Sequence, residues 1–205
     1  MKVSVIGSGN MGAALAGQLA KAGHSVTLAS RNADTAAAVA LATGATVVPA
    51  SRAAEAEVVF LATSAPDAAA ALTAAGNLGN AVVVDITNPL TADYMGLTIG
   101  HTTSSAEEIA KAVPGVRLVK GFNTVFAQLL NAGARGGNVT AFLASDDAAA
   151  KATVGELARS MGFAVTDAGP LKNARYLEPL AGLNIYLGYG AGLGTAISPT
   201  WVSAA

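Results

Sequence analysis

The chain has 205 residues, a formal net charge of -1, no cysteine and two histidines. A net charge near zero argues against a nucleic-acid partner, which needs a basic surface, and the lack of cysteine excludes disulfides and thiolate metal sites. With two histidines in the whole chain, we expect no metal site of the usual kind.

The hydrophobic fraction of 52% does not indicate a membrane protein. Much of this fraction is alanine, and no run of about 18 apolar residues is free of Asn, Asp, Lys or repeated Gly. The first residues carry a strand pattern where a signal peptide would have its apolar region. We therefore expect a cytoplasmic chain with no membrane partner.

The first half is organised around Gly7-Ser8-Gly9-Asn10-Met11-Gly12. This stretch lies between an apolar run at 3–6 and an Ala-rich helical pattern at 13–22, so a strand, a glycine loop and a helix follow one another. A second strand is predicted at 25–29. In that context the G-x-G-x-x-G pattern favours a dinucleotide site over an ordinary glycine turn.

Each glycine has a role in such a site. Gly7 permits the tight turn after the strand, Gly9 lets the backbone approach a pyrophosphate, and Gly12 lets the helix pack closely on the strand. The free N–H groups at the start of the helix would then point at the phosphates.

The second strand ends in Ser30-Arg31-Asn32. A site for NAD usually places Asp or Glu here to accept hydrogen bonds from the ribose 2′-hydroxyl, whereas NADP needs positive charge and hydroxyls for its 2′-phosphate. Arg31 carries a permanent, forked set of donors, and Ser30 and Asn32 add neutral donors. The pattern favours NADP(H), with a solvated loop charge at Arg31 as the alternative.

A helix is predicted at 33–43, ended by Gly44, with a short strand at 46–48 and a buried strand at 58–62. The loop Thr63-Ser64-Ala65-Pro66 follows at the carboxyl edge of the sheet, which faces the ligand in open α/β folds. Thr63 and Ser64 are therefore candidates to line the adenosine half of a cofactor, or else simply to cap a helix.

Two more strands, at 81–86 and 116–120, end at the same edge. The first is followed by Thr87-Asn88-Pro89 and the second by Gly121-Phe122-Asn123-Thr124. Asn88 is placed to hydrogen-bond the nicotinamide ribose or carboxamide, or to shape the turn before Pro89. Asn123 and Thr124 are candidates for positioning the reacting rings.

The remaining elements fit a single domain spanning 1–205. Ser104-Ser105-Ala106-Glu107 predicts a capped helix, 139–144 and 163–166 predict strands, 146–161 predicts a helix, and a helical pattern begins at Leu171. We expect an α/β, Rossmann-type, doubly wound and mostly parallel sheet, in which 171–205 caps the crevice or forms a dimer interface. The apolar, glycine-rich stretch 183–201 favours a homodimer.

Few catalytic groups are available. None of the four tyrosines has a lysine four residues on, which excludes the Tyr-x-x-x-Lys chemistry of short-chain dehydrogenases. His101 and Lys172 remain as candidate acids. Hydride transfer to a flavin-like ring fits this set best, because it depends mainly on holding two rings together.

The chain resembles the NADPH-dependent oxidoreductases of the deazaflavin coenzyme F420, a family that includes the NADPH-binding domain of STEAP-type ferric reductases. The resemblance covers nearly the whole chain and rests most on two motifs. These are Lys120-Gly121-Phe122-Asn123-Thr124 and Ala174-Arg175-Tyr176-Leu177-Glu178-Pro179-Leu180-Ala181. The glycine loop, Ser30-Arg31 and Asn88-Pro89 support the resemblance as well.

The resemblance implies a homodimer in which NADP(H) lies across the carboxyl edge and the acceptor ring, F420 or FMN/FAD, stacks on the nicotinamide. Characterised deazaflavin enzymes have His-Thr where this chain has Asn123-Thr124, so NADPH is implied more firmly than the acceptor. An imine or β-hydroxyacid reductase with Lys172 as acid is an alternative, although few residues follow Lys172 for the usual helical domain. A non-catalytic NADP-sensing module is another.

Overall fold

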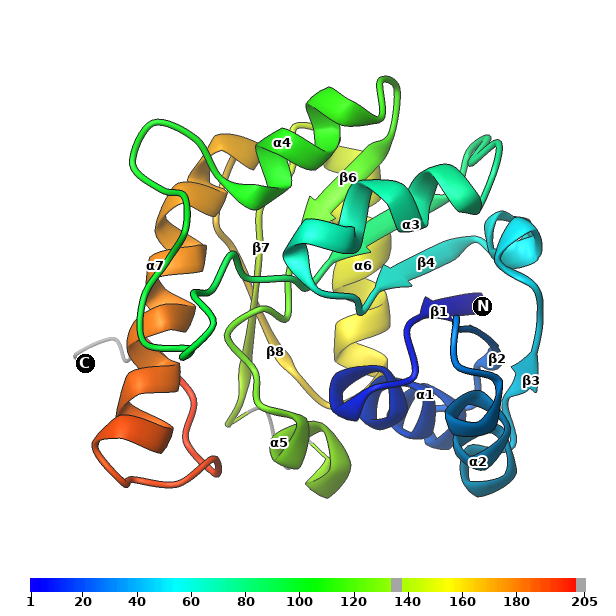
Figure 1. The fold of residues 1–205 in the computed structure, drawn as a ribbon, viewed down its shortest axis with the longest axis horizontal. Coiled ribbons are helices and arrows are strands. Elements are labelled where there is room, and N and C mark those ends of the chain that lie inside the picture. The colour runs from blue at the N-terminus through cyan, green and yellow to red at the C-terminus, as the bar shows by residue number, and fades with distance from the viewer. Residues whose placement is uncertain (134–137, 202–205) are drawn as a thin grey trace.

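The computed structural model describes residues 1–133 and 138–201 and contains a six-stranded parallel sheet in the order β3-β2-β1-β4-β5-β6 (Figure 1). The strands are β1 (Lys2–Ile6), β2 (Ser25–Ala29), β3 (Thr46–Val47), β4 (Val58–Leu61), β5 (Val82–Asp85) and β6 (Arg117–Lys120). The chain starts in the middle of the sheet, builds out to β3 and then continues from β4 to the other edge. This is the Rossmann strand order, so the predicted doubly wound fold is confirmed.

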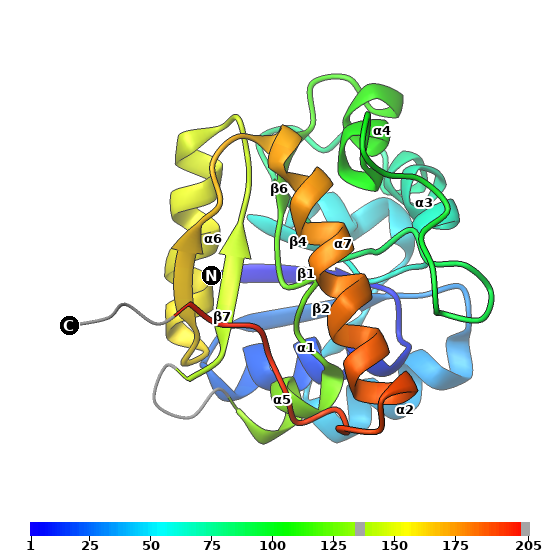
Figure 2. The same cartoon turned by 90° about the vertical axis from the view of Figure 1, so that its left-hand side faces the viewer.

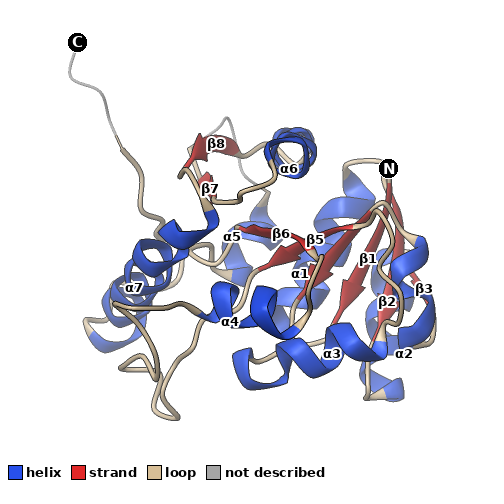
Figure 3. Cartoon of the chain, turned by 90° about the horizontal axis from the view of Figure 1, so that it is seen from above, coloured by secondary structure: helices blue, strands red, loops and turns tan. Residues whose placement is uncertain are grey.

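Helices cover both faces of this sheet (Figure 3). They are α1 (Asn10–Lys21), α2 (Ala33–Thr43), α3 (Ala68–Ala74), α4 (Ser105–Ala112), α5 (Ala127–Ala132), α6 (Ala148–Ser160) and α7 (Ala174–Ile185), with short turns η1 (Ala50–Glu55), η2 (Ala65–Asp67) and η4 (Leu171–Asn173). A hydrophobic core lies on each face of the sheet, and alternate residues of β1 point into the two cores. Val3 and Val5 pack with α1, α2, α5 and α6, whereas Ile6 packs with α3 and α4.

Local sequence signals fix several helix ends. The Asn32 side chain accepts a hydrogen bond from the Thr35 N–H at the start of α2, and Gly44 ends that helix with φ of 77°. The Ser104 side chain likewise accepts from the Glu107 N–H at the start of α4. The start of α1 was predicted too late, at 13 rather than Asn10, because Gly9 itself is the N-cap and the glycine loop leads directly into the helix.

The strands predicted at 139–144 and 163–166 do not join the main sheet. They form β7 (Thr140–Leu143) and β8 (Ala164–Asp167), which pair with each other in parallel as a separate two-stranded sheet, seen beside α6 in Figure 3. A single antiparallel bridge between Lys120 and Ala144 joins this small sheet to β6.

The helix α7 crosses in front of the carboxyl ends of the parallel strands (Figure 2). It contains Pro179 and continues into a π-helical turn, η5 (Tyr186–Gly190). The helical pattern predicted from Leu171 is therefore present, and α7 forms a wall opposite the glycine loop. Among the described residues, no helix is both long and apolar enough to cross a membrane.

Candidate cofactor and acceptor site

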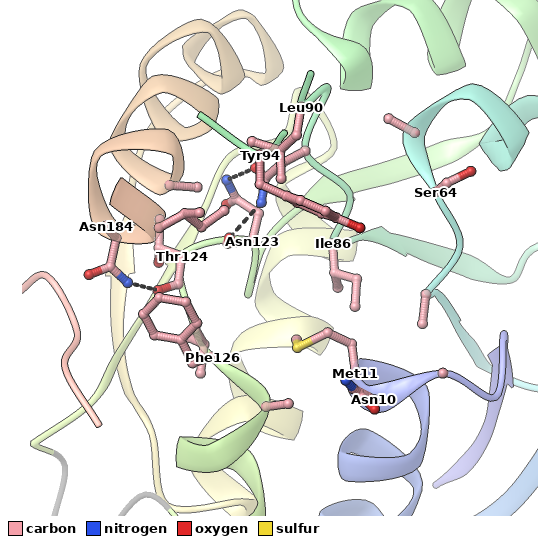
Figure 4. A pocket seen from close by; sticks show the side chains of 18 of the residues that line it. Asn10, Met11, Ser64, Ile86, Leu90, Tyr94, Asn123, Thr124, Phe126 and Asn184 are labelled. Carbon is pink, nitrogen blue, oxygen red and sulfur yellow. Dashed lines mark hydrogen bonds between the residues drawn. The ribbon is translucent and has the colours of Figure 1, made fainter. Parts of the chain in front are cut away.

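A cleft of about 910 Å³ opens at the carboxyl edge of the sheet, between the glycine loop and α7 (Figure 4). Its walls come from the exit loops of β1, β4, β5 and β6 and from α5 and α7. Those loops converge because all the strands are parallel, which is why ligands bind at this edge in open α/β folds.

The geometry of the glycine loop matches the roles predicted for its residues. A Cβ on Gly7, whose φ is 118°, would collide with the Ala62 carbonyl, and a Cβ on Gly12 would collide with the Gly7 carbonyl. A Cβ on Gly9 would meet nothing within 4 Å, so that residue is open toward the cleft. No side chain caps the start of α1, which leaves its first N–H groups free for an anion.

Hydroxyl groups gather where an adenosine ribose would lie in this fold. The Ser8 Oγ lies 2.7 Å from the Ser30 Oγ and 2.6 Å from the Thr35 Oγ1. The side chain of Asn32 accepts the Thr35 N–H as the cap of α2, and its backbone N–H donates to the Ser30 Oγ at 3.2 Å. Thr35 was not predicted as a site residue. Its position in the first turn of α2, after an N-cap Asn, was the available signal.

Arg31 lies beside these hydroxyls and makes an ion pair that the sequence did not indicate. Its Nη2 donates to the Asp67 Oδ2 at 2.9 Å, and the two side chains are 87% and 43% exposed. The Ser64 Oγ donates to the same Asp67 oxygen, also at 2.9 Å. Hydrogen bonds from Ser64 and then from Arg31 hold the pKa of the Asp67 carboxyl below its usual range.

Thr63 and Ser64 both line the cleft, as predicted for the loop after β4. Ser64 precedes η2, but its side chain makes no capping hydrogen bond to the backbone, because the hydroxyl is taken by Asp67. The Thr63 hydroxyl donates to the Ser64 carbonyl at 3.2 Å. The alternative of a plain helix cap therefore does not describe Ser64.

Asn88 and Asn123 pair with each other across the ends of β5 and β6. The Asn88 Nδ2 donates to the Asn123 carbonyl at 2.8 Å, and the Asn123 Nδ2 donates to the Asn88 Oδ1 at 3.0 Å and to the Leu177 carbonyl at 2.8 Å. Asn88 thus shapes the loop as well as lining the cleft. Pro89 does not line the cleft, and its carbonyl accepts the Thr98 N–H at 2.7 Å.

Two buried oxygen atoms at the end of β6 lack partners within the part of the chain that the structure describes. They are the Asn123 Oδ1 and the Thr124 Oγ1, on residues that are 6% and 2% exposed and that line the cleft. Burying a polar atom without a hydrogen bond costs about 1–3 kcal/mol. Both atoms are therefore candidates to bind a ligand.

Phe122 sets the direction of this turn. It is fully buried with φ of 58°, and its ring contacts Phe60 and Phe163 edge to face at centroid distances of 5.6 and 5.4 Å. A positive φ at a bulky residue is strained and persists only where the surroundings enforce it. Here the aromatic contacts hold Phe122 in the core, and the turn presents Asn123 and Thr124 at the cleft.

A buried charge cluster lies at the ends of β5 and β6. The Lys120 Nζ is 2.9 Å from the Asp85 Oδ2 and 2.9 Å from the Glu178 Oε1, and all three side chains are almost completely buried. The Glu178 carboxylate also accepts the Ser105 and Ala106 N–H groups at the start of α4. The cluster was not predicted, since its members lie far apart in sequence.

The outer part of the cleft is aromatic. Tyr94, Phe126 and Tyr189 line it, and Phe126 and Tyr189 meet edge to face at 5.8 Å. Figure 4 shows Tyr94 and Phe126 on opposite sides of Thr124. Tyr94 also has a positive φ, of 62°.

The cleft carries no charged side chain within residues 1–133 and 138–201, and its ionisable groups there are the phenols of Tyr94 and Tyr189. Its lining holds neutral amides, hydroxyls and apolar side chains, with no Asp, Glu, Lys, Arg or His. The two candidate acids, His101 and Lys172, are exposed and lie outside it. The structure therefore does not bring either one to the reacting position.

Comparisons with known proteins point to one family. The profile described as "NADP oxidoreductase coenzyme F420-dependent" matches residues 2–89. The chain is 33% identical over 179 residues to metalloreductase STEAP3 of Rattus norvegicus, an alignment that covers 87% of this chain and 36% of that relative. It is 31% identical over 99 residues to metalloreductase STEAP2 of Homo sapiens, covering 48% of this chain and 19% of that one. The chain thus spans about a third or less of the length of these curated relatives.

A crystal structure offers a match over the whole length. A proposed F420-dependent NADP reductase from Arthrobacter sp. FB24 superimposes with a TM-score of 0.84 at 34% identity, covering 95% of this chain and 96% of that one. An imine reductase from Pseudomonas sp. superimposes with a TM-score of 0.68 at 20% identity, covering 93% of this chain and 63% of that one. The second likeness shows the fold alone.

Proposed function

The chain belongs to the family of coenzyme F420-dependent NADP oxidoreductases, and from that premise we propose that it transfers a hydride between NADP(H) and a flavin-like ring. Deazaflavin F420 is the first candidate for the acceptor, and FMN or FAD is the second. The observation that carries the proposal is the pair of unpartnered buried oxygens, Asn123 Oδ1 and Thr124 Oγ1, in a cleft whose described lining holds no charged side chain.

The glycine loop supports binding of the cofactor's phosphates. Gly9 leaves room for a close approach, and the uncapped N-terminus of α1 offers N–H donors to a pyrophosphate. Arg31 offers positive charge to a 2′-phosphate, and the hydroxyls of Ser8, Ser30 and Thr35 offer neutral donors beside it. These residues fit NADP(H) better than NAD(H), because no carboxylate occupies the end of β2.

The inner end of the cleft supports positioning of two rings. When bound, NADPH supplies the hydride. Asn123 Oδ1 can accept a hydrogen bond from a ring or carboxamide N–H, and the Thr124 hydroxyl can donate or accept one. Both residues are nearly fully buried, so they can fix a ring with little freedom of their own.

The aromatic residues support a flat acceptor. Tyr94, Phe126 and Tyr189 provide apolar surface to a planar ring, and the described lining places no charged side chain beside it. Hydride transfer between rings gains mainly from positioning, which can supply about 7–11 kcal/mol. The accompanying proton can come from solvent.

The imine or β-hydroxyacid reductase alternative is less well supported. The acid that this alternative assigns is Lys172, which is exposed and lies outside the cleft. A non-catalytic NADP-sensing role would not explain why the cleft is also lined by the aromatic side chains of Tyr94, Phe126 and Tyr189.

A panel of acceptors tests the proposed function. Purified protein is mixed with NADPH and, in turn, with F420, FMN, FAD, a cyclic imine and a β-keto acid, and consumption of NADPH is followed. We expect turnover with F420 or a flavin. Turnover with the imine or keto acid alone would contradict the proposal, as would binding of NADPH with no acceptor reduced.

A further inference from the structure

We propose that Asp67 is a specificity-determining residue, which opposes the 2′-phosphate at Arg31 and so limits the preference for NADP(H) over NAD(H). This inference rests on the proposed NADP(H) function. Asp67 was not expected to have any role, and its carboxylate lies on the guanidinium that the 2′-phosphate requires.

The fold brings the two residues together from different loops. Arg31 follows β2 and Asp67 ends η2, which follows β4, and these two strands flank β1 in the sheet. The ion pair therefore spans the rim of the adenosine side, with Nη2 and Oδ2 at 2.9 Å. The position of Asp67 is fixed independently of Arg31, because the Ser64 hydroxyl donates to the same oxygen.

The carboxylate stays charged at neutral pH. Hydrogen bonds from Ser64 and then from Arg31 keep the pKa of Asp67 below its usual range. If the 2′-phosphate displaces Asp67, the existing ion pair is lost. If it binds beside Asp67, a phosphate of charge near −2 lies close to a carboxylate. In both cases Asp67 weakens the binding of the phosphate.

The other groups at this position do not offset that charge. The hydroxyls of Ser8, Ser30 and Thr35 are neutral, and the side chain of Asn32 caps α2. The net charge of the Arg31 and Asp67 side chains therefore determines the local electrostatic potential at the position of a 2′-phosphate. A ribose 2′-hydroxyl carries no charge, so NAD(H) does not experience the same repulsion.

The test is calorimetric titration of the Asp67→Asn variant with NADPH, NADH, 2′,5′-ADP and 5′-AMP. Asparagine keeps an oxygen for the Ser64 hydroxyl but removes the charge. Exposed ion pairs are weak, so we expect NADPH and 2′,5′-ADP to bind roughly two- to fivefold more tightly. The affinities for NADH and 5′-AMP should not change, and the gain should shrink at high salt.

Glu55→Gln is the matched control. Glu55 pairs with Arg52 on η1 in another exposed ion pair, so its replacement removes the same charge away from the proposed site. This variant should bind all four ligands like the unchanged protein. Tighter NADPH binding by Glu55→Gln as well would overturn the proposal, since the effect would then be one of overall charge.

Two other results would overturn the inference. Unchanged NADPH affinity in Asp67→Asn would mean that the carboxylate does not compete for Arg31. Weaker binding of both NADPH and NADH would mean that Asp67 positions Arg31 to contact the adenosine, which both cofactors share. The Arg31→Ala variant tests the assignment of NADP(H) separately. If this change leaves the NADPH affinity unaltered, the assignment of NADP(H) is wrong, whatever the role of Asp67.

Discussion

Thr124 allows the acceptor half of the site to be tested at a single atom. Its hydroxyl is buried at the cleft and has no partner among the described residues, so replacing it by the similarly shaped valine leaves no other group unpaired. We predict that Thr124→Val keeps its stability and its NADPH affinity but loses about five- to tenfold in turnover, the equivalent of one hydrogen bond.

Stopped-flow kinetics and calorimetry of Thr124→Val, side by side, would check this. Thr153→Val, at a half-buried position on α6 outside the cleft, is the control and should turn over normally. His101→Ala and Lys172→Ala should also be active, since both residues lie outside the cleft. Full turnover by Thr124→Val, or loss of turnover in Lys172→Ala, would argue against the assigned positioning role.

Arg31 tests the cofactor half. A charge-assisted hydrogen bond is worth about 1.5–3 kcal/mol, and we predict that Arg31→Ala weakens NADPH by an amount near the lower end because the side chain is exposed. NADH affinity should hardly change. Titration of both cofactors measures the difference, with Arg52→Ala as a control of equal charge. Equal affinity of the unchanged protein for NADPH and NADH would contradict the NADP(H) assignment.

The sequence predicted which residues lie near the cleft better than it predicted their hydrogen-bond and ion-pair partners. Asn123 and Thr124 were predicted at the carboxyl edge because they lie in the loop that follows a predicted strand, and the structure places both at the cleft. The ion pair of Arg31 with Asp67 was not foreseen. Partners in different loops leave no local spacing in the sequence, and only the sheet order brings them together.

At the scale of elements, the charge cluster of Lys120, Asp85 and Glu178 joins β5, β6, α4 and α7. Removing the only cation of this cluster would leave two buried carboxylates without compensation. We predict that Lys120→Met destabilises the protein by about 3–5 kcal/mol in urea unfolding, as expected when one partner of a buried ion pair is removed.

Comparison with two other variants makes that measurement specific. Glu178→Gln should cost less than Lys120→Met, since it relieves the excess of negative charge while keeping a hydrogen-bond acceptor for the start of α4. Arg52→Met, in an exposed pair that solvent screens, should cost much less than Lys120→Met. A similarly small loss in Lys120→Met would show that the cluster does not hold these elements together.

The elements themselves were largely predictable, but their pairing was less so. Short runs of apolar residues identified the central strands β1, β4 and β5, since strands in the middle of a parallel sheet are buried on both faces. The same signal could not show that β7 and β8 leave the main sheet, because sheet membership depends on the path of the chain through α5 and on contacts with α7. The buried ion pair of Asp85 and Lys120 could not be predicted for a related reason. In the sequence each residue stands near the end of a predicted strand, where a charged side chain is usually exposed.

For the whole molecule, we predict a homodimer formed through α7 and the segment after it. Exposed apolar side chains gather there, namely Tyr176, Leu183, Tyr186, Tyr189, Leu193 and Trp201. Such surfaces on soluble proteins usually mark an interaction site. Light scattering of the eluting protein at micromolar concentration should give the mass of two chains.

Two variants locate the predicted dimer interface. Leu183→Lys, at a side chain that is 55% exposed on α7, should give a monomer that still binds NADPH. Leu41→Lys, at an 89% exposed leucine on α2, should leave the dimer intact. A monomer mass for the unchanged protein would contradict the prediction.

The alternation of strands and helices was enough to predict the overall architecture. It fixed the α/β class, and the glycine loop with Ser30-Arg31 predicted where a dinucleotide would lie. The acceptor could not be deduced in the same way. The aromatic surface proposed for it comes from Tyr94, Phe126 and Tyr189, which belong to three distant segments without a shared motif.

Direct transfer of a labelled hydride tests the central claim most directly. NADPH carrying deuterium at the transferable position of its nicotinamide is mixed with the protein and F420 in ordinary water, and the reduced deazaflavin is examined by mass spectrometry. Because a deazaflavin receives the hydride on a ring carbon, we predict that the product carries one deuterium. A product without deuterium, or no reduction of F420 or of a flavin by a protein that binds NADPH, would contradict the account.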